Sequence, residues 1–266
     1  MNKISNLAVV SKNARIAEGV EIGPFSIIED EVEIGANVRI LPHACICKGT
    51  SIGENTQVHM GAVIGNIPQD LGFDANKKTY TRIGKNTVIR EYATIHRATE
   101  EGSATVVGDN CYLMAVSHIG HDCHIGNNVI IANGALLAGH VSVGDYAFIS
   151  GNVVMHQFCR IGTLAMIGGF TGINKDVPPY MLVRGPSVIR GVNLVGLRRL
   201  KIPREVIGEI KEAYKLIFMS NLNTAQAVEG IKKLKPSKEL DHLVDFIQTS
   251  KRGICKYKYS DDEYFE

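Results

Sequence analysis

An aliphatic side chain recurs at every sixth position through roughly two-thirds of this chain. A period of six matches neither the 3.6-residue turn of a helix nor the two-residue alternation of a strand. It is typical of a hexapeptide solenoid, in which each hexad forms a short strand plus a corner and stacked coils share one core. The positions are Ile4, Val10, Ile16, Ile22, Ile28, Ile34, Ile40, Ile46, Ile52, Val58, Ile64, Ile83, Ile89, Ile95, Val107, Leu113, Ile119, Ile125, Ile131, Leu137, Val143, Ile149, Met155, Ile161, Ile167 and Ile173.

The hexads also set the size of the solenoid. Three of them complete a triangular coil of about 18 residues, which rises by about 4.8 Å, the spacing of neighbouring strands, so we expect about nine coils. Glycine often follows the aliphatic residue, as at Gly35, Gly53 and Gly126. We expect these corners to need backbone angles that favour glycine.

Two interruptions and one end point divide the chain. The repeat is absent from 66–80 and again from about 97–104, and insertions of this kind leave a solenoid as loops beside its binding face. After Pro179 the repeat stops, and helical patterns follow from Pro203 to Met219, from a cap at Thr224 and after Pro236. The sequence predicts a β-solenoid over 1–190 and a small α-helical domain over 191–266.

The composition excludes several classes of protein. The formal net charge is only +2, so bulk binding of nucleic acid is not expected. No apolar run approaches the ~18 residues of a membrane span, and the first residues lack the apolar stretch of a signal peptide. We expect a soluble cytoplasmic protein.

The six cysteines do not suggest a disulfide framework. Cys111, Cys123 and Cys159 each lie two residues before a repeat aliphatic, in a slot otherwise filled by small or β-branched residues, so we expect them to pack as small hydrophobic side chains. Cys45 and Cys47 are too close in sequence for a usual structural zinc site. We therefore expect no metal.

Four histidines are spaced by about one coil each or less, which places them on one face of adjacent coils. They are His118, His121, His140 and His156. Asp122 directly follows His121 and is able to orient its ring or stabilise its imidazolium form. Gly139 lies about one coil from His121 and could donate a backbone N–H to an oxyanion.

Three interpretations of these histidines remain open. Any one of them could be a solvated surface residue, and the run His118, His121 and His124 could supply imidazoles to zinc. Hexapeptide solenoids of the γ-carbonic anhydrase class do bind zinc through histidines, but in a different arrangement. General-base catalysis of direct acyl transfer fits better, because there is no Gly-x-Ser-x-Gly elbow and no plausible nucleophilic cysteine.

Several motifs, in their order along nearly the whole chain, resemble those of the UDP-N-acetylglucosamine acyltransferases of lipid A synthesis. The motifs span 64–71, 90–97, 118–123, 137–141, 156–159, 176–180 and 193–199. A related N-acyltransferase family has an extra N-terminal uridine-binding domain, whereas the hexads here begin at Ile4.

The resemblance implies a homotrimer of left-handed parallel β-helices with active sites between subunits. It implies transfer of a 3-hydroxyacyl chain from acyl carrier protein to the 3-position of UDP-N-acetylglucosamine, the first step of lipid A synthesis. No cofactor is implied beyond the phosphopantetheine of the acyl carrier protein. A concentration of basic residues near the domain junction suits that acidic partner: Arg198, Arg199, Lys201, Arg204, Lys211 and Lys215.

By the same resemblance, His121 is the general base, Asp122 supports it and Gly139 supplies the oxyanion-hole amide. The implied sugar-nucleotide site consists of Gln69, Asp70, His118, His140, His156 and Gln157, with Asn193 and Arg199 at the uracil or phosphate end. Gly169 matches a position that sets the length of the acyl chain.

The chain departs from the family pattern in the loop after Gln69 and Asp70, where Gly72 replaces a lysine. This departure leaves open a 3-amino sugar as acceptor, which would give an amide. Two other readings also remain: a hexapeptide transferase that uses acyl-CoA, and an inert solenoid that serves as a scaffold or binds metal.

Overall fold

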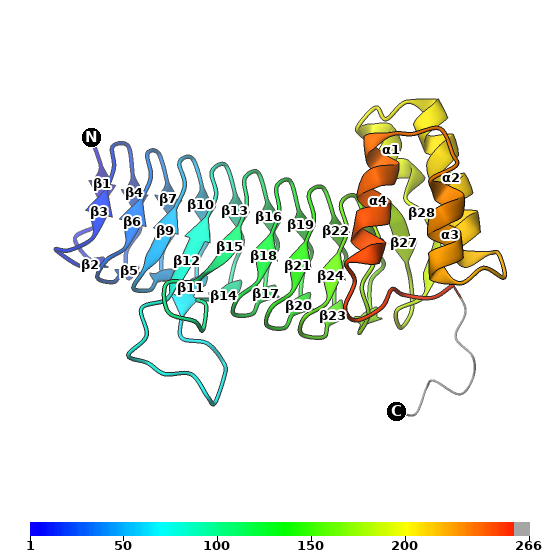
Figure 1. The fold of residues 1–266 in the computed structure, drawn as a ribbon. Helices are drawn as coiled ribbons and strands as arrows, with labels where there is room; N and C mark the ends of the chain where they lie inside the picture. The colour runs from blue at the N-terminus through cyan, green and yellow to red at the C-terminus, as the bar shows by residue number, and fades with distance from the viewer. Residues whose placement is uncertain (258–266) are drawn as a thin grey trace.

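Short parallel strands joined by corners build a three-sided prism, as Figure 1 shows. The computed structural model describes residues 1–257; the end of the predicted helical domain, 258–266, lies outside the described residues. Within 1–257, the strands form sheets of 11, 9 and 8 strands, which we name sheets A, B and C.

The strands follow one another around the prism in the order A, B, C. Sheet A contains β1 (Lys3–Ile4), β4 (Glu21–Ile22), β7 (Arg39–Ile40), β10 (Gln57–Val58), β13 (Val88–Ile89), β16 (Tyr112–Leu113), β19 (Ile130–Ile131), β22 (Phe148–Ile149), β25 (Met166–Ile167), β27 (Met181–Val183) and β28 (Ile189–Val192). Sheet B contains β2 (Val9–Val10), β5 (Ile27–Ile28), β8 (Cys45–Ile46), β11 (Val63–Asn66), β14 (Thr94–His96), β17 (His118–Ile119), β20 (Leu136–Leu137), β23 (Val154–Met155) and β26 (Gly172–Ile173). Sheet C contains β3 (Arg15–Ile16), β6 (Glu33–Ile34), β9 (Thr50–Ile52), β12 (Tyr80–Ile83), β15 (Ala104–Val107), β18 (His124–Ile125), β21 (Ser142–Val143) and β24 (Arg160–Ile161).

The repeat aliphatics stack directly on one another from coil to coil. Ile119 pairs with Leu137, and Leu137 pairs with Met155, in parallel register. These side chains are at most 3% exposed. Burial of each one stabilises the fold by about 1.5–3 kcal/mol before the entropy cost of ordering the side chain is subtracted. The predicted fold, a left-handed parallel β-helix followed by a small helical part, is confirmed.

Except at Gly65 (φ 82°), the glycines that follow the aliphatics have a different role from the one that the sequence suggested. Gly35 has an ordinary negative φ, and a Cβ there would lie 2.7 Å from the backbone nitrogen of Glu54 in the next coil. The left-handed position comes two residues later, at Asn37 (φ 57°), where an amide side chain tolerates it. Asn37 donates to Asn55 at 3.2 Å, and this ladder of corner asparagines continues to Asn86 and Asn110.

Both insertions leave the prism between sheets B and C, in consecutive coils. The longer one, 67–79, joins β11 to β12 and projects from the prism in Figure 1, and the shorter one, 97–103, joins β14 to β15. The Lys77 ammonium lies 2.9 Å from the Glu100 carboxylate, and the Gly102 amide donates to Lys78 at 2.8 Å. The two loops therefore brace each other.

A small helical part covers the last coils. It contains α1 (Leu194–Arg199), α2 (Arg204–Phe218), α3 (Thr224–Ile231) and α4 (Lys238–Gln248). The sequence missed α1, which is too short for periodicity to reveal, and the antiparallel strand β28. It also misplaced one cap, because Asn223, not Thr224, caps α3 in a capping box with Gln226. None of the helices in the described part is long and apolar enough to cross a bilayer.

Candidate active site

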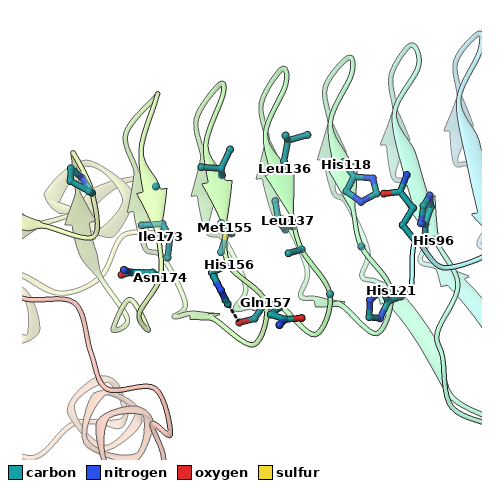
Figure 2. Close-up of a pocket in the computed structure, with 17 residues that line it drawn as sticks. His96, His118, His121, Leu136, Leu137, Met155, His156, Gln157, Ile173 and Asn174 are labelled. Carbon is teal, nitrogen blue, oxygen red and sulfur yellow. Dashed lines mark hydrogen bonds between the residues drawn. The ribbon is translucent and has the colours of Figure 1, made fainter. Parts of the chain in front are cut away.

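A pocket of about 710 Å³ lies along the edge between sheets B and C, in the later coils (Figure 2). Its lining includes polar residues from the corners after the sheet B strands and apolar residues from the strands themselves. The lining residues are Gln69, His96, His118, Gly120, His121, Leu136, Leu137, Ala138, Gly139, Val154, Met155, His156, Gln157, Gly172, Ile173, Asn174 and Pro186.

His121 and Asp122 form a tightly bound pair at this edge. The His121 Nδ1 atom lies 2.8 Å from Oδ2 of Asp122, and the two side chains are only 16% and 11% exposed. Because a carboxylate accepts hydrogen bonds, Nδ1 carries the proton and Nε2 is left with a lone pair. His121 is therefore prepared to accept a proton at Nε2.

Asp122 is itself held in place by groups that the sequence reasoning missed. The backbone N–H of Thr99 donates to Oδ1 and Oδ2 at 3.1 and 3.2 Å, and its hydroxyl donates to Oδ2 at 2.7 Å. Burial alone would raise the pKa of Asp122, but hydrogen bonds from His121 and Thr99 outweigh it and hold the pKa below its ordinary value. Thr99 belongs to the shorter insertion, so this loop acts with His121 to keep the carboxylate ionised.

Gly139 packs directly against the ring of His121. A Cβ at this position would lie 2.5 Å from Cε1 and 2.6 Å from Nε2 of that ring, so glycine is required here by close approach. Within residues 1–257, the backbone N–H of Gly139 donates to no other group. A free N–H donor therefore lies beside the basic nitrogen.

His140 lies behind His121 and outside the pocket lining. The two rings meet edge to face with centroids 5.1 Å apart, and Nε2 of His140 lies 3.7 Å from Oδ2 of Asp122. The ring of His140 also stacks on Phe158 at 4.5 Å. This packing fixes the orientation of His140 toward the same carboxylate.

His118 contacts a second histidine that the sequence reasoning did not select. His118 forms a hydrogen bond with the Thr94 hydroxyl at 2.8 Å and meets the ring of His96 edge to face at 5.0 Å. His96 is 6% exposed and lines the pocket. The signal that could have revealed His96 is its position, because it directly follows a repeat aliphatic, as His156 does.

Of the remaining polar residues predicted for the site, some line the pocket and one lies outside the lining. His156 and Gln157 line the pocket, and His156 Nδ1 donates to the Gln157 carbonyl at 3.1 Å (Figure 2). Gln69 reaches the pocket from the longer insertion. Asp70 is exposed outside the lining, where its carboxylate accepts from the Gly72 amide at 2.9 Å.

The pocket also has an apolar part, which the sequence reasoning missed. Leu136, Val154 and Gly172 are paired neighbours on the outer face of sheet B. A Cβ at Gly172 would make only one contact, with Val154 at 3.9 Å. The absence of a side chain there leaves an apolar hollow, and Gly169 lies just beyond it at the corner between β25 and β26.

Two predicted residues lie far from this pocket within one chain. Asn193 and Arg199 line a separate hollow of about 600 Å³ on sheet A. The Asn193 side chain is already engaged, since it caps α1 through the Gly196 amide at 3.0 Å and donates to the Leu164 carbonyl at 2.7 Å. One chain alone does not bring these two residues to the histidines.

The structure also bears on the zinc interpretation. His124 lies on β18 in sheet C, in a hollow on another face of the prism, so the run His118, His121 and His124 does not converge. His121, Asp122 and His140 do offer ligand atoms within 4.8 Å of one another. The hydrogen bonds to Asp122 described above make this trio a supported base, and a proton acceptor is the role that its geometry favours.

Comparison with known proteins decides the family. A family model described as UDP-N-acetylglucosamine O-acyltransferase, domain 2, matches residues 176–255, and a hexapeptide transferase model matches residues 13–48, 31–66 and 104–139. A relative from Thermodesulfovibrio yellowstonii, named acyl-[acyl-carrier-protein]–UDP-N-acetylglucosamine O-acyltransferase, is 47% identical over 96% of this chain and 100% of its own length. The chain belongs to the UDP-N-acetylglucosamine O-acyltransferase family.

Solved structures agree with this assignment. A UDP-N-acetylglucosamine acyltransferase from Bacteroides fragilis is 43% identical, with a TM-score of 0.91 over 94% of this chain and 98% of that chain. The enzyme of the same name from Francisella novicida is 42% identical, with a TM-score of 0.92 over 95% and 94%. The family predicted from the motifs is therefore confirmed.

We predict that the buried histidines make the protein acid-sensitive. Burial, reinforced by His118 and His121, lowers the pKa of His96 from 6.5 to about 4. The unfolded chain thus binds more protons between these values, so stability falls as the pH is lowered from about 6.5 towards 4. Thermal midpoints of the wild type and His96→Asn at pH 7 and pH 4.5 measure this loss.

We expect His96→Asn to lose less stability than the wild type over that pH interval. The exposed His124 is the matched control, and His124→Asn should lose as much as the wild type. Equal losses in all three proteins would show that His96 does not contribute.

Proposed function

We propose that this protein transfers an acyl group from acyl carrier protein to the 3-hydroxyl of UDP-N-acetylglucosamine. The observation that carries the proposal is the His121–Asp122 pair packed against Gly139, whose backbone N–H is free within residues 1–257, at the edge of a partly apolar pocket. The relatives are named for acyl carrier protein as the acyl donor and UDP-N-acetylglucosamine as the acceptor.

The chemistry follows from the positions of these groups. His121 Nε2 removes the proton from the sugar hydroxyl as its oxygen attacks the thioester carbonyl carbon. The negative charge on the carbonyl oxygen is stabilised by the Gly139 N–H, and Asp122 stabilises the imidazolium. Collapse of the intermediate breaks the C–S bond, and the departing sulfur takes the proton from His121.

Each of these contributions has an expected size. A positioned general base accelerates such reactions by about 10²–10⁴-fold. One oxyanion-hole donor is typically worth about 10²–10³-fold in kcat. Because a direct transfer needs no enzyme nucleophile, we propose that the phosphopantetheine of acyl carrier protein is the only prosthetic group required.

The hollow on sheet B suits the acyl chain. A 3-hydroxyacyl chain whose carbonyl lies at Gly139 would cross Leu136, Val154 and Gly172 towards the corner at Gly169. We propose that Gly169 and the open position at Gly172 together set the chain length. The polar groups of the pocket, with Asp70 and His140 at its margin, would then bind the sugar nucleotide: Gln69, His118, His156 and Gln157.

We also propose a homotrimer with shared sites. Sheet A carries the hollow with Asn193 and Arg199, and sheet B carries the histidine pocket. One chain therefore holds the two halves of the proposed substrate site on different faces. A closed threefold ring in which sheet A of one subunit faces sheet B of the next would unite them three times. Arg199 is exposed and suits a phosphate or the phosphopantetheine arm.

An acyl-transfer assay tests the proposed reaction. Mass spectrometry would follow the products formed from acyl carrier protein donors with UDP-N-acetylglucosamine and with its 3-amino analogue. We expect the ester, His121→Ala to reduce kcat by about 10²–10⁴-fold, and His124→Ala, the control on sheet C, to keep wild-type activity. Exclusive amide formation would identify the 3-amino sugar as acceptor, and full activity of His121→Ala would refute the mechanism.

Asp122→Asn gives a second readout on the same mechanism. A neutral amide keeps the shape but no longer stabilises the imidazolium, so we expect a lower kcat and an acid limb of the pH–rate profile that moves to lower pH. An unchanged profile would show that the carboxylate only fills space.

Mixing two inactive variants tests the shared site. If His121 of one subunit acts with Arg199 of its neighbour, a mixed trimer of His121→Ala and Arg199→Ala chains contains one site with both residues intact. Co-expression of the two variants should therefore restore activity well above that of either alone. If the residues act within one chain, no mixture will recover activity.

A further inference from the structure

Within residues 1–257, a pair of cysteines outside the pocket belongs to a cluster of metal-ligating side chains that the proposed reaction does not use. Cys45 lies on β8 and is partly exposed on the outer face of sheet B, between its paired neighbours Ile27 and Val63. Cys47 follows two residues later. Cys47 lies just beyond the end of β8 and is buried, but its sulfur still contacts that of the partly exposed Cys45.

The distance between the two sulfurs is the informative quantity. The Sγ atoms of Cys45 and Cys47 lie 3.8 Å apart. Two sulfurs bound at about 2.3 Å to one tetrahedral zinc ion are about 3.8 Å apart, whereas a disulfide would require about 2.05 Å. The separation fits the hydrogen bond between the two thiols, and two sulfurs bound to a single ion would need the same spacing.

The carboxylate of Glu29 adds a third ligand to the two sulfurs. Glu29, Cys45 and Cys47 each offer a ligand atom, and these atoms all lie within 4.8 Å of one another. The Lys48 amide donates to Oε2 of Glu29 at 2.8 Å, which holds the carboxylate in place. The Lys48 ammonium is instead directed to Glu31, at 3.3 Å, so it does not neutralise Glu29.

The hydrogen-bond partner of each thiol also distinguishes this pair from the other cysteines. The thiols of Cys45 and Cys47 are hydrogen-bonded to each other, whereas those of Cys111, Cys123, Cys159 and Cys255 donate to backbone carbonyls. A cation that binds both sulfurs displaces their protons to solvent.

We propose that Cys45, Cys47 and Glu29 form a site for one thiophilic divalent cation, such as zinc or cadmium. Two thiolates and one carboxylate suit these ions better than magnesium or calcium. The short sequence spacing argued against a structural zinc site, but the strand geometry brings the sulfurs to the separation that an ion requires. The site is independent of the proposed acyl transfer.

Titration of the reduced full-length protein with cadmium tests the proposal. Cadmium bound to thiolate gives an ultraviolet charge-transfer band, which histidine and carboxylate sites do not give. We expect the band to saturate at one cadmium per chain. Cys45→Ser should weaken binding by roughly 100-fold and Glu29→Gln by roughly 10-fold, with thermal melts showing that each variant remains folded.

Two controls make the outcome decisive. His121→Ala removes a ligand of the other candidate cluster and should leave the band unchanged. Cys47→Ser changes a buried residue, and its loss of the band supports the site if its melting temperature stays near that of the wild type. No band in the reduced wild type, or an equal band in Cys45→Ser, would overturn the proposal.

Discussion

The stacking of each repeat aliphatic on its counterpart one coil away is the interaction on which the whole structure depends. Ile119 on Leu137 and Leu137 on Met155 fix the parallel register of sheet B and fill the core. Once the inner side chains are in register, every outer side chain also lies above its counterpart in the next coil. Core stacking alone therefore aligns the outer side chains in rigid rows along each sheet. No contact between functional residues is needed for this alignment.

The geometry of the proposed active site derives from that register. His121 and Gly139 occupy equivalent corners of consecutive coils, so the ring lies against the backbone that carries the free N–H. The two insertions modify the row without breaking it: one supplies Gln69 to the pocket, and the other supplies Thr99 to Asp122. Groups held this way need little reorganisation during reaction, which is the condition for electrostatic stabilisation of a transition state.

The sequence was most informative wherever the period of six applied. It predicted the solenoid, and its coil length brought His118, His121 and His156 to one edge. It could not place His96, because an insertion separates that residue from His118 and the hexads do not measure loops. Asn193 and Arg199 came from motif resemblance, which says nothing about which face they occupy. The cysteine pair was set aside on sequence spacing, whereas the distance between sulfurs depends on side-chain direction.

The kcat of Gly139→Ala tests most directly whether coil stacking builds the proposed catalytic site. A methyl group there would meet the His121 ring at 2.5 Å, whereas Gly208→Ala, the matched control on α2, meets nothing within 4 Å. We predict that Gly139→Ala remains folded and loses at least about 100-fold in kcat, while Gly208→Ala keeps wild-type activity. Wild-type kcat in a folded Gly139→Ala protein would contradict the account.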